Sequence, residues 1–319
     1  MIGFIIRRFF QSILVIACVL FIVFFLFHLE GAEALARSID ATPRASQSQL
    51  NQVIKIYGFN KPIWNQMWIL FIQYLHLDFG RSTMANQNAS TLIATALPRS
   101  LLLIGMSTVF ALLVAIPLGV YQVVRRNRPD DYFATGAVFI LYAAPDYVIG
   151  VVLILIFAEH WHLFAPTILP SESIWQIATS WKQITLPMLT LSSTTVAAFS
   201  RYMRSSMMDS LAEDYIRTAR AKGAGRLRVL FRHAFRNALL PMITLLGLSL
   251  PAIAGGAVLT ETVFNYPGMG LLTYEAAQTT DVPLLLGTAL VATLATVVGS
   301  FLADVMYAVI DPRIRYASR

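Results

Sequence analysis

One stretch of the chain reads Asp214-Tyr215-Ile216-Arg217-Thr218-Ala219-Arg220-Ala221-Lys222-Gly223. It belongs to a basic segment from Arg201 to Asn237 that holds nine Lys or Arg residues and three acidic ones, in a chain that is 57% hydrophobic. The pattern predicts a short helix, and Gly223 is expected to end it because glycine readily adopts the left-handed conformation of many helix ends. One side of this helix would be small and apolar with a cationic edge, formed by Tyr215, Ile216, Ala219 and Lys222.

Such a helix, placed between hydrophobic segments, is expected to dock its small apolar side on another surface. Charge alone leaves two surfaces open. One is a partner protein, and the other is the layer of anionic lipid headgroups on which basic segments next to a membrane often rest.

The rest of the chain has the composition of a membrane protein. Charged residues make up 13% of it, against about 25% in average proteins. A spanning helix needs about 20 mainly apolar residues, and its backbone polar groups must be satisfied within the segment. The predicted fold class is therefore an all-α polytopic membrane protein with six transmembrane helices, at Phe9–Leu29, Ser100–Val123, Tyr132–Ala158, Ile184–Met208, Ala238–Val258 and Val282–Val309.

The distribution of cations predicts the orientation in the membrane. With the N-terminus inside, 17 of the 24 Lys and Arg residues fall on the inner side, as the positive-inside rule requires. Both termini are therefore predicted to be cytoplasmic. The net charge of +7 follows from this clustering beside apolar spans, so nucleic acid is not an expected partner, whereas membrane lipids are.

The first apolar run, Phe9–Leu29, is predicted to be a retained span. It has 21 residues, more than the roughly 7–15 of a signal-peptide core. We expect residues 1–99 to form this span and a long extracytoplasmic segment. Residues 100–319 are expected to form a transmembrane core with a cytoplasmic loop at 209–237.

Three polar residues inside predicted spans are candidates for a solute path. Asp146 is predicted to lie deep in the third span, where an ionisable group is costly and marks a functional site by default; the alternative is a partnered, structural carboxylate. Ser192 and Thr195 belong to a polar run in the fourth span that could line a wet path or bond neighbouring helices.

No metal site is predicted from the sequence. The single cysteine, Cys18, lies in the first apolar run, and a lone thiol cannot form an intrachain disulfide or a thiolate cluster. His160 and His162 are two residues apart on a predicted loop, which is a weak pattern for metal binding.

The basic stretch resembles the cytoplasmic "EAA" loop of ABC importer permeases, in the version of the oligopeptide/dipeptide/nickel permease family. The resemblance rests on Arg217 to Gly223 and on Arg232-His233-Ala234-Phe235-Arg236-Asn237-Ala238-Leu239-Leu240-Pro241. Arg217 stands where the wider superfamily has a glutamate, so no role of that glutamate is carried over. Two further segments resemble the family, namely Glu261 to Gly270 and Asp304 to Arg313.

The resemblance covers nearly the whole chain and implies a type I ABC importer permease (MetI-like) bundle in a bacterial inner membrane. It implies that Asp214 to Gly223 form the helix that couples to ATPase subunits. It also implies a docking side for an extracytoplasmic binding protein, near Glu261, Phe264, Tyr266, Pro267 and Gly268. The implied partners are a second, related permease chain, two ATPase subunits and the binding protein.

The resemblance further implies transport by alternating access, driven by ATP in the partner subunits. Peptides are the expected solute, with nickel, haem or another small solute as alternatives. The chain has no Gly-x-x-x-x-Gly-Lys-Ser/Thr phosphate loop, so ATP and Mg are expected in the ATPase subunits and no cofactor in this chain. One rival class is a membrane-embedded enzyme, but the predicted spans of this chain hold no pair of a nucleophile and a base. The other rival class is a secondary transporter or channel.

Overall fold

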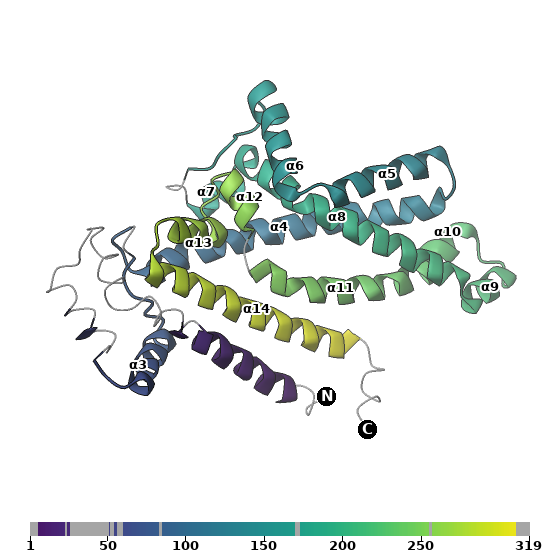
Figure 1. Ribbon diagram of the computed structural model, residues 1–319. Helices are drawn as coiled ribbons and strands as arrows, with labels where there is room; N and C mark the ends of the chain where they lie inside the picture. Colours follow the sequence, from purple (N-terminus) through teal and green to yellow (C-terminus); the bar gives the residue numbers. More distant parts are fainter. Residues whose placement is uncertain are drawn as a thin grey trace. The chain divides into compact units, whose positions relative to one another are not determined.

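The computed structural model describes residues 6–22, 24–25, 51, 54–55, 60–82, 85–169, 173–254 and 257–310. Within these residues the regular elements are helices, and the one β contact is an isolated bridge between Arg81 and Asn88 (Figure 1). The predicted all-α fold is therefore confirmed.

The helices follow one another along the chain with short connections. Residues 6–22 and 24–25 are helical. The labelled elements are α3 (Ile63–Leu75), α4 (Ala89–Val124), α5 (Pro129–Ala143), α6 (Asp146–Leu153), the π-helix η1 (Ile154–His160), α7 (Ile174–Thr179), α8 (Trp181–Ala212), α9 (Asp214–Ala221), α10 (Arg226–Arg228), the π-helix η2 (Val229–Phe235), α11 (Arg236–Ala254), α12 (Val258–Val263), α13 (Met269–Gln278) and α14 (Val282–Ile310).

Two of the described helices are long and apolar enough to cross a membrane, at Ala89–Val124 and Val282–Ala303, and α5 with α6–η1 adds a third if this bent pair is one span. Two of the other predicted spans coincide with helices: Ile184–Met208 lies within α8, and most of Ala238–Val258 lies within α11. Part of Phe9–Leu29 lies outside the described residues. The count of six spans stays a prediction.

The predicted span Tyr132–Ala158 is interrupted at Pro145. The axes of α5 and α6–η1 meet at 106°, and Figure 1 shows α6 turning away from α5. Proline disfavours the helical conformation in the residue before it, and Ala144 is accordingly extended, with φ −76° and ψ 131°. Pro145 then caps α6. The expectation of one continuous helix over Tyr132–Ala158 is therefore wrong, because Pro145 divides it.

The chain divides into two compact units. The first comprises Met1–Leu101, Pro251–Thr262 and Tyr266–Phe301, and the second comprises Leu102–Leu250, Val263–Asn265 and Leu302–Arg319. The predicted division after residue 99 concerns position relative to the membrane, which a division by contacts does not test.

Each unit has its own apolar core. In the first unit, side chains of α3, α4, α13 and α14 pack together, including Ile93, Met269 and Leu284. In the second unit, α4, α8, α9, η2 and α11 contribute to one core, which includes Met203 and Ile216. The short helix predicted in the basic segment is thus joined to the core of the second unit.

Helices α4 and α8 touch at Gly119 within the second unit. A Cβ atom on this glycine would lie 2.6 Å from Cβ of Met203 and 2.7 Å from the carbonyl oxygen of Ser200. Real Cβ atoms essentially never approach other atoms so closely. A glycine is therefore required here, and the backbones of the two helices are in direct contact.

Candidate functional site

Helix α9 begins where α8 ends. Glu213 lies between them in an extended conformation, with φ −67° and ψ 149°, and it serves as the N-cap residue of α9. Asp214 follows in the first turn, where a negative charge interacts favourably with the helix dipole. Figure 1 shows α9 at the end of α8, close to α10. The predicted short helix is therefore confirmed and spans Asp214–Ala221.

The end of α9 has the hydrogen bonds of a Schellman motif. The N–H of Ala224 donates to the carbonyl of Ala219 at 3.1 Å, and the N–H of Gly223 donates to the carbonyl of Arg220 at 2.9 Å. Gly223 has φ +80°, a conformation that side chains disfavour. The prediction that Gly223 ends the helix is confirmed.

The apolar side of α9 is covered in part by the chain itself. Ile216 is fully buried in the core that also contains Met207, Val229 and Ala234. Ala219 is half-buried, whereas Tyr215 stays exposed, so docking of this side on another surface stays a prediction. The exposed residues of α9 are Asp214, Tyr215, Arg217, Thr218, Arg220 and Ala221, and Lys222 after the helix is also exposed.

The exposed residues of α9 carry charges of both signs beside Tyr215 and Ala221. Arg217 Nη1 lies 3.2 Å from Asp214 Oδ1, and both side chains are largely exposed. An exposed ion pair of this kind contributes little to stability. Both charges therefore stay accessible to another molecule.

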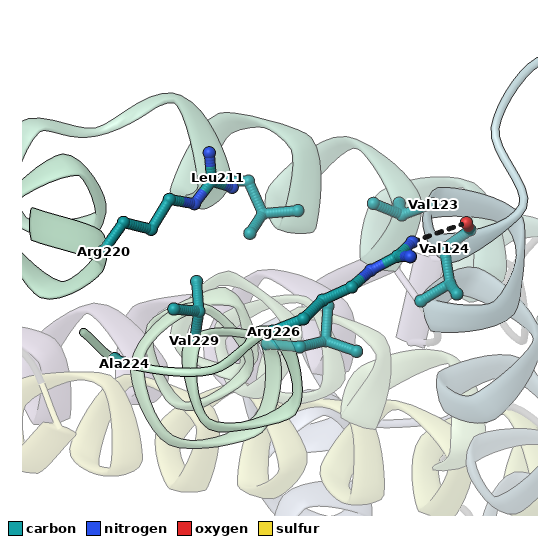
Figure 2. A pocket seen from close by; sticks show the side chains of 8 residues that line it. Val123, Val124, Leu211, Arg220, Ala224, Arg226 and Val229 are labelled. Atoms are coloured by element: carbon teal, nitrogen blue, oxygen red, sulfur yellow. Dashed lines mark hydrogen bonds between the residues drawn. The ribbon is translucent and has the colours of Figure 1, made fainter.

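A cavity of about 410 Å³ lies between the ends of α4 and α8 and the segment that follows α9. Figure 2 shows Arg220 and Arg226 among otherwise apolar lining residues, with the side chain of Arg226 extending to Val124. Nη2 of Arg226 donates to the carbonyl of Val124 at 3.5 Å, where a cation suits the C-terminal end of α4. None of the eight lining residues is acidic.

An ion pair with a buried acid and a partly buried arginine lies in the same unit. Asp131, at the start of α5, is 1% exposed, and its Oδ2 lies 2.9 Å from Nη2 of Arg204 on α8. The sequence signal of Asp131 was an acidic residue next to an apolar segment, but nothing in the sequence identified its partner 73 residues away.

Asp146 is paired, and it does not lie midway along a continuous helix. It is half-buried in the first turn of α6, where the helix N-terminus favours negative charge. The hydroxyl of Thr194 on α8 donates to Asp146 Oδ1. This pairing ties α6 to α8. Its role in a solute path stays a prediction.

Of the other two path candidates, Ser192 is less exposed than Asp146 and Thr195 is half-buried as Asp146 is. Ser192 is 2% exposed, and its hydroxyl donates to the carbonyl of Leu189 at 2.9 Å. Thr195 is half-buried and donates to the carbonyl of Leu191 at 3.4 Å. Hydroxyl groups bonded to their own helix in this way need no second helix as partner. Their role in a solute path likewise stays a prediction.

Glu261, in the first unit, caps helix α13. Its Oε2 accepts the N–H groups of Gly270 at 2.7 Å and Leu271 at 3.1 Å, and its Oε1 accepts the hydroxyl of Ser100 at 2.6 Å. The N–H of Met269 donates to Ser100 Oγ at 2.7 Å. The two side chains thus satisfy the N–H groups of the first turn of α13, which have no partner within the helix.

Burial raises the pKa of Glu261 above its usual range, and the hydrogen bonds from Ser100, Leu271 and Gly270 oppose this shift. Burial likewise raises the pKa of Tyr266, with a smaller contribution from the nearby charge of Glu261. The Tyr266 hydroxyl donates to the carbonyl of Arg99 at 2.7 Å. These groups hold the turn together within the first unit.

Most residues of the predicted docking side are therefore interior. Glu261, Phe264 and Tyr266 are at most 1% exposed, Gly268 is buried, and Pro267 is half-buried. Docking of a binding protein near this turn stays a prediction, and the contacts would come from its exposed neighbours.

Within the described residues, no group of three or more His, Cys, Asp or Glu side chains could hold a metal ion. His160 and His162 are both exposed, and Nδ1 of His162 lies 3.3 Å from the carbonyl of His160. The sequence prediction that the chain holds no metal is not tested by this arrangement.

Comparison with known proteins gives consistent matches along the chain. Residues 111–316 match the family described as binding-protein-dependent transport system inner membrane component. The chain is 36% identical to the oligopeptide transport system permease protein AppB of Bacillus subtilis, over 99% of this chain and 100% of that protein. It is 33% identical to the glutathione transport system permease protein GsiC of Escherichia coli K12, over 99% and 100%, and 32% identical to a putative peptide permease protein of Brucella ovis, over 92% and 93%.

Proposed function

The chain belongs to the binding-protein-dependent transport system inner membrane component family, and on this premise we propose that it carries peptides and couples to ATPase subunits through α9. It is a permease subunit of an ABC importer, a multi-pass membrane protein rather than an enzyme. The partners proposed for it are two ATPase subunits that bind ATP and Mg, a second related permease chain and an extracytoplasmic binding protein.

The geometry of α9 is the observation that carries the coupling proposal. Ile216 anchors the helix in the core of the second unit, and Gly223 fixes where it ends. Its outer side, with Asp214, Arg217 and Thr218, is exposed and charged. A helix held rigidly on one side and exposed on the other can transmit a displacement, because its anchored side cannot yield without disturbing the core.

The proposed solute follows from the relatives. Those compared are named for oligopeptide, peptide or glutathione transport, and glutathione is itself a short peptide. We therefore propose peptides over nickel, haem or other small solutes. The proposed location is a bacterial inner membrane, with both termini cytoplasmic and Asp146, Ser192 and Thr195 near the path.

Cysteine cross-linking in the assembled transporter tests the docking of α9. Cys18 is the only cysteine, so its replacement by alanine gives a background without thiols. In that background, Thr218→Cys on the exposed side of α9 is expected to cross-link to an ATPase subunit. Ala234→Cys is the control, because Ala234 is fully buried. Absence of any cross-link from Thr218→Cys in an active transporter would contradict docking through this side.

The solute is tested separately, on the binding protein. The partner binding protein, purified from cells without added ligand, is expected to release short peptides on denaturation, as identified by mass spectrometry. Release of nickel or haem instead would refute the proposed solute and leave the coupling proposal untouched.

A further inference from the structure

Helix α8 carries α9 at its end and holds α5 by a buried ion pair. Arg204 lies eight residues before the last residue of α8, or about 12 Å at 1.5 Å per residue. Its Nη2 donates to Asp131 Oδ2 at 2.9 Å and its Nη1 to Thr135 Oγ1 at 2.6 Å. Both acceptors are on α5, so the guanidinium binds that helix at two successive turns.

Both carboxylate oxygens of Asp131 accept further hydrogen bonds. Asp131 Oδ2 also accepts the backbone N–H of Asn127 at 3.1 Å, and its Oδ1 accepts the hydroxyl of Thr135 at 3.3 Å. Nε2 of Gln122, near the end of α4, reaches Thr135 Oγ1 at 3.3 Å. A buried charge with its hydrogen-bonding positions filled resists rearrangement, because removal of one partner leaves the other uncompensated.

A second polar contact joins α8 to the helix beyond the break. Thr194 of α8 donates to Asp146, the first residue of α6. Thr194 and Arg204 are ten residues apart on one continuous helix. Helix α8 therefore holds α5 on one side of Pro145 and α6 on the other.

The register of α8 against α4 is fixed beside this pair. Gly119 of α4 touches Ser200 and Met203 of α8, and Met203 directly precedes Arg204. The guanidinium thus leaves α8 at a point where the helix cannot shift along its neighbour. Its position relative to α5 is correspondingly well defined.

We propose that Asp131 and Arg204 are positioning residues that make the end of α8, helix α9 and the start of α5 move as one body. A displacement of α9 by an ATPase subunit then reaches the break at Pro145. This inference rests on the proposed function, since it requires that α9 receives the displacement. The pair itself touches no solute and no nucleotide.

The test compares variants in the complete transporter, reconstituted in liposomes with its binding protein. The variants are Asp131→Asn, Arg204→Gln, the double variant and Arg204→Lys. The readout is the number of solute molecules imported per ATP hydrolysed. Asp130→Asn is the matched control, because Asp130 is the neighbouring acid and its contacts are exposed: it accepts the hydroxyl of Tyr121 at 2.8 Å and lies 3.7 Å from Nε of Arg125.

The Asp131→Asn and Arg204→Gln variants are each expected to import about tenfold less solute per ATP than the parent, since the ion pair is broken. The Asp130→Asn control is expected to stay within about twofold of the parent, since exposed pairs contribute little. The import per ATP of Arg204→Lys is expected to lie between these two values, because lysine keeps the charge but cannot reproduce the two guanidinium hydrogen bonds to Asp131 and Thr135. The double variant relieves the uncompensated charge, so it should assemble, yet it should import as little per ATP as the single variants.

Restored import per ATP in the double variant would overturn the proposal, because it would show that only an unpaired charge mattered. The proposal would also be overturned if Asp131→Asn and Arg204→Gln imported solute per ATP within twofold of the Asp130→Asn control. Failure of the double variant to assemble would overturn it too. Thr218→Cys cross-linking in the parent transporter separates the two proposals. A missing cross-link refutes the docking of α9, and a cross-link with unchanged import per ATP refutes only the role of the pair.

Discussion

The carboxylate of Glu261 occupies the space that a side chain on Gly268 would need: a Cβ atom there would lie 2.5 Å from Glu261 Oε2. The hydroxyl of Ser100 blocks the same position. Gly270 is restricted similarly, since its Cβ would lie 2.6 Å from Cα of Val258 and 2.9 Å from Glu261 Oε2. The two glycines are therefore required by the carboxylate that caps α13.

Gly268→Ala is expected to lower the stability of the first unit. The added methyl group must displace Glu261 and Ser100, and overpacking of this kind costs about 1–3 kcal/mol. The measurement is the thermal unfolding midpoint of the protein purified in detergent. Gly105→Ala on α4 is the control, because nothing lies within 4 Å of its Cβ position, so its midpoint should not fall. Equal midpoints for both variants would contradict the steric argument.

The stability of this region is expected to depend on pH through Glu261. Its raised pKa in the folded protein means that the folded state holds the proton at pH values where the unfolded state has lost it. Stability is then greatest below the usual glutamate pKa, about 4.3, and falls as pH rises through the raised value. The unfolding midpoint should therefore fall with rising pH in the parent more than in Glu261→Gln. A constant difference between the two proteins across this range would refute the assignment.

Gly223→Ala is expected to impair coupling. Nothing lies within 4 Å of its Cβ position, so the effect is backbone strain alone, about 1–2 kcal/mol for a side chain in the left-handed conformation. ATP-driven uptake should then fall by about fivefold or more. Gly225→Ala is the control, since it has equal space and φ −65°. Similar uptake by both variants would show that the end of α9 is not critical.

Charge reversal at Arg220 should uncouple ATP hydrolysis from uptake, because Arg220 is exposed on α9 and also lines the cavity beside it. The comparison is the Arg220→Glu transporter with an Arg228→Glu transporter, since Arg228 is exposed but does not line that cavity. Uptake per ATP should fall in the first more than in the second. The reverse order would place the coupling surface on α10.

Two variants separate the charge of Asp146 from its hydrogen bond. Asp146→Asn removes the charge and can still accept from Thr194, whereas Thr194→Val keeps the charge and removes the donor. If the charge serves the solute path, uptake should fall more in Asp146→Asn, with assembly intact. A larger loss in Thr194→Val, or loss of assembly in either, would favour a structural role.

Local chemistry made parts of this structure predictable. Gly223 ends α9 and Pro145 interrupts a helix because each residue limits its own backbone or that of its neighbour. Long-range pairing was not predictable. The pattern of α9 placed Ile216 on an apolar side of the helix, but it did not show that α8 and η2 cover this residue. Asp131 likewise gave no indication that Arg204 is its partner. Glu261 was expected near a surface, whereas it caps α13 through N–H groups nine and ten residues later.

The contact at Gly119 limits how the second unit can deform. Packed helices commonly slide over one another through small adjustments of their side chains, but here the backbone of Gly119 meets the carbonyl of Ser200 and the Cβ atom of Met203, which cannot adjust independently of the α8 backbone. Gliding of α8 along α4 is therefore blocked, while rotation about the contact is not. We therefore expect a displacement at one end of α8 to turn the helix about Gly119 and to move its other end in the opposite direction.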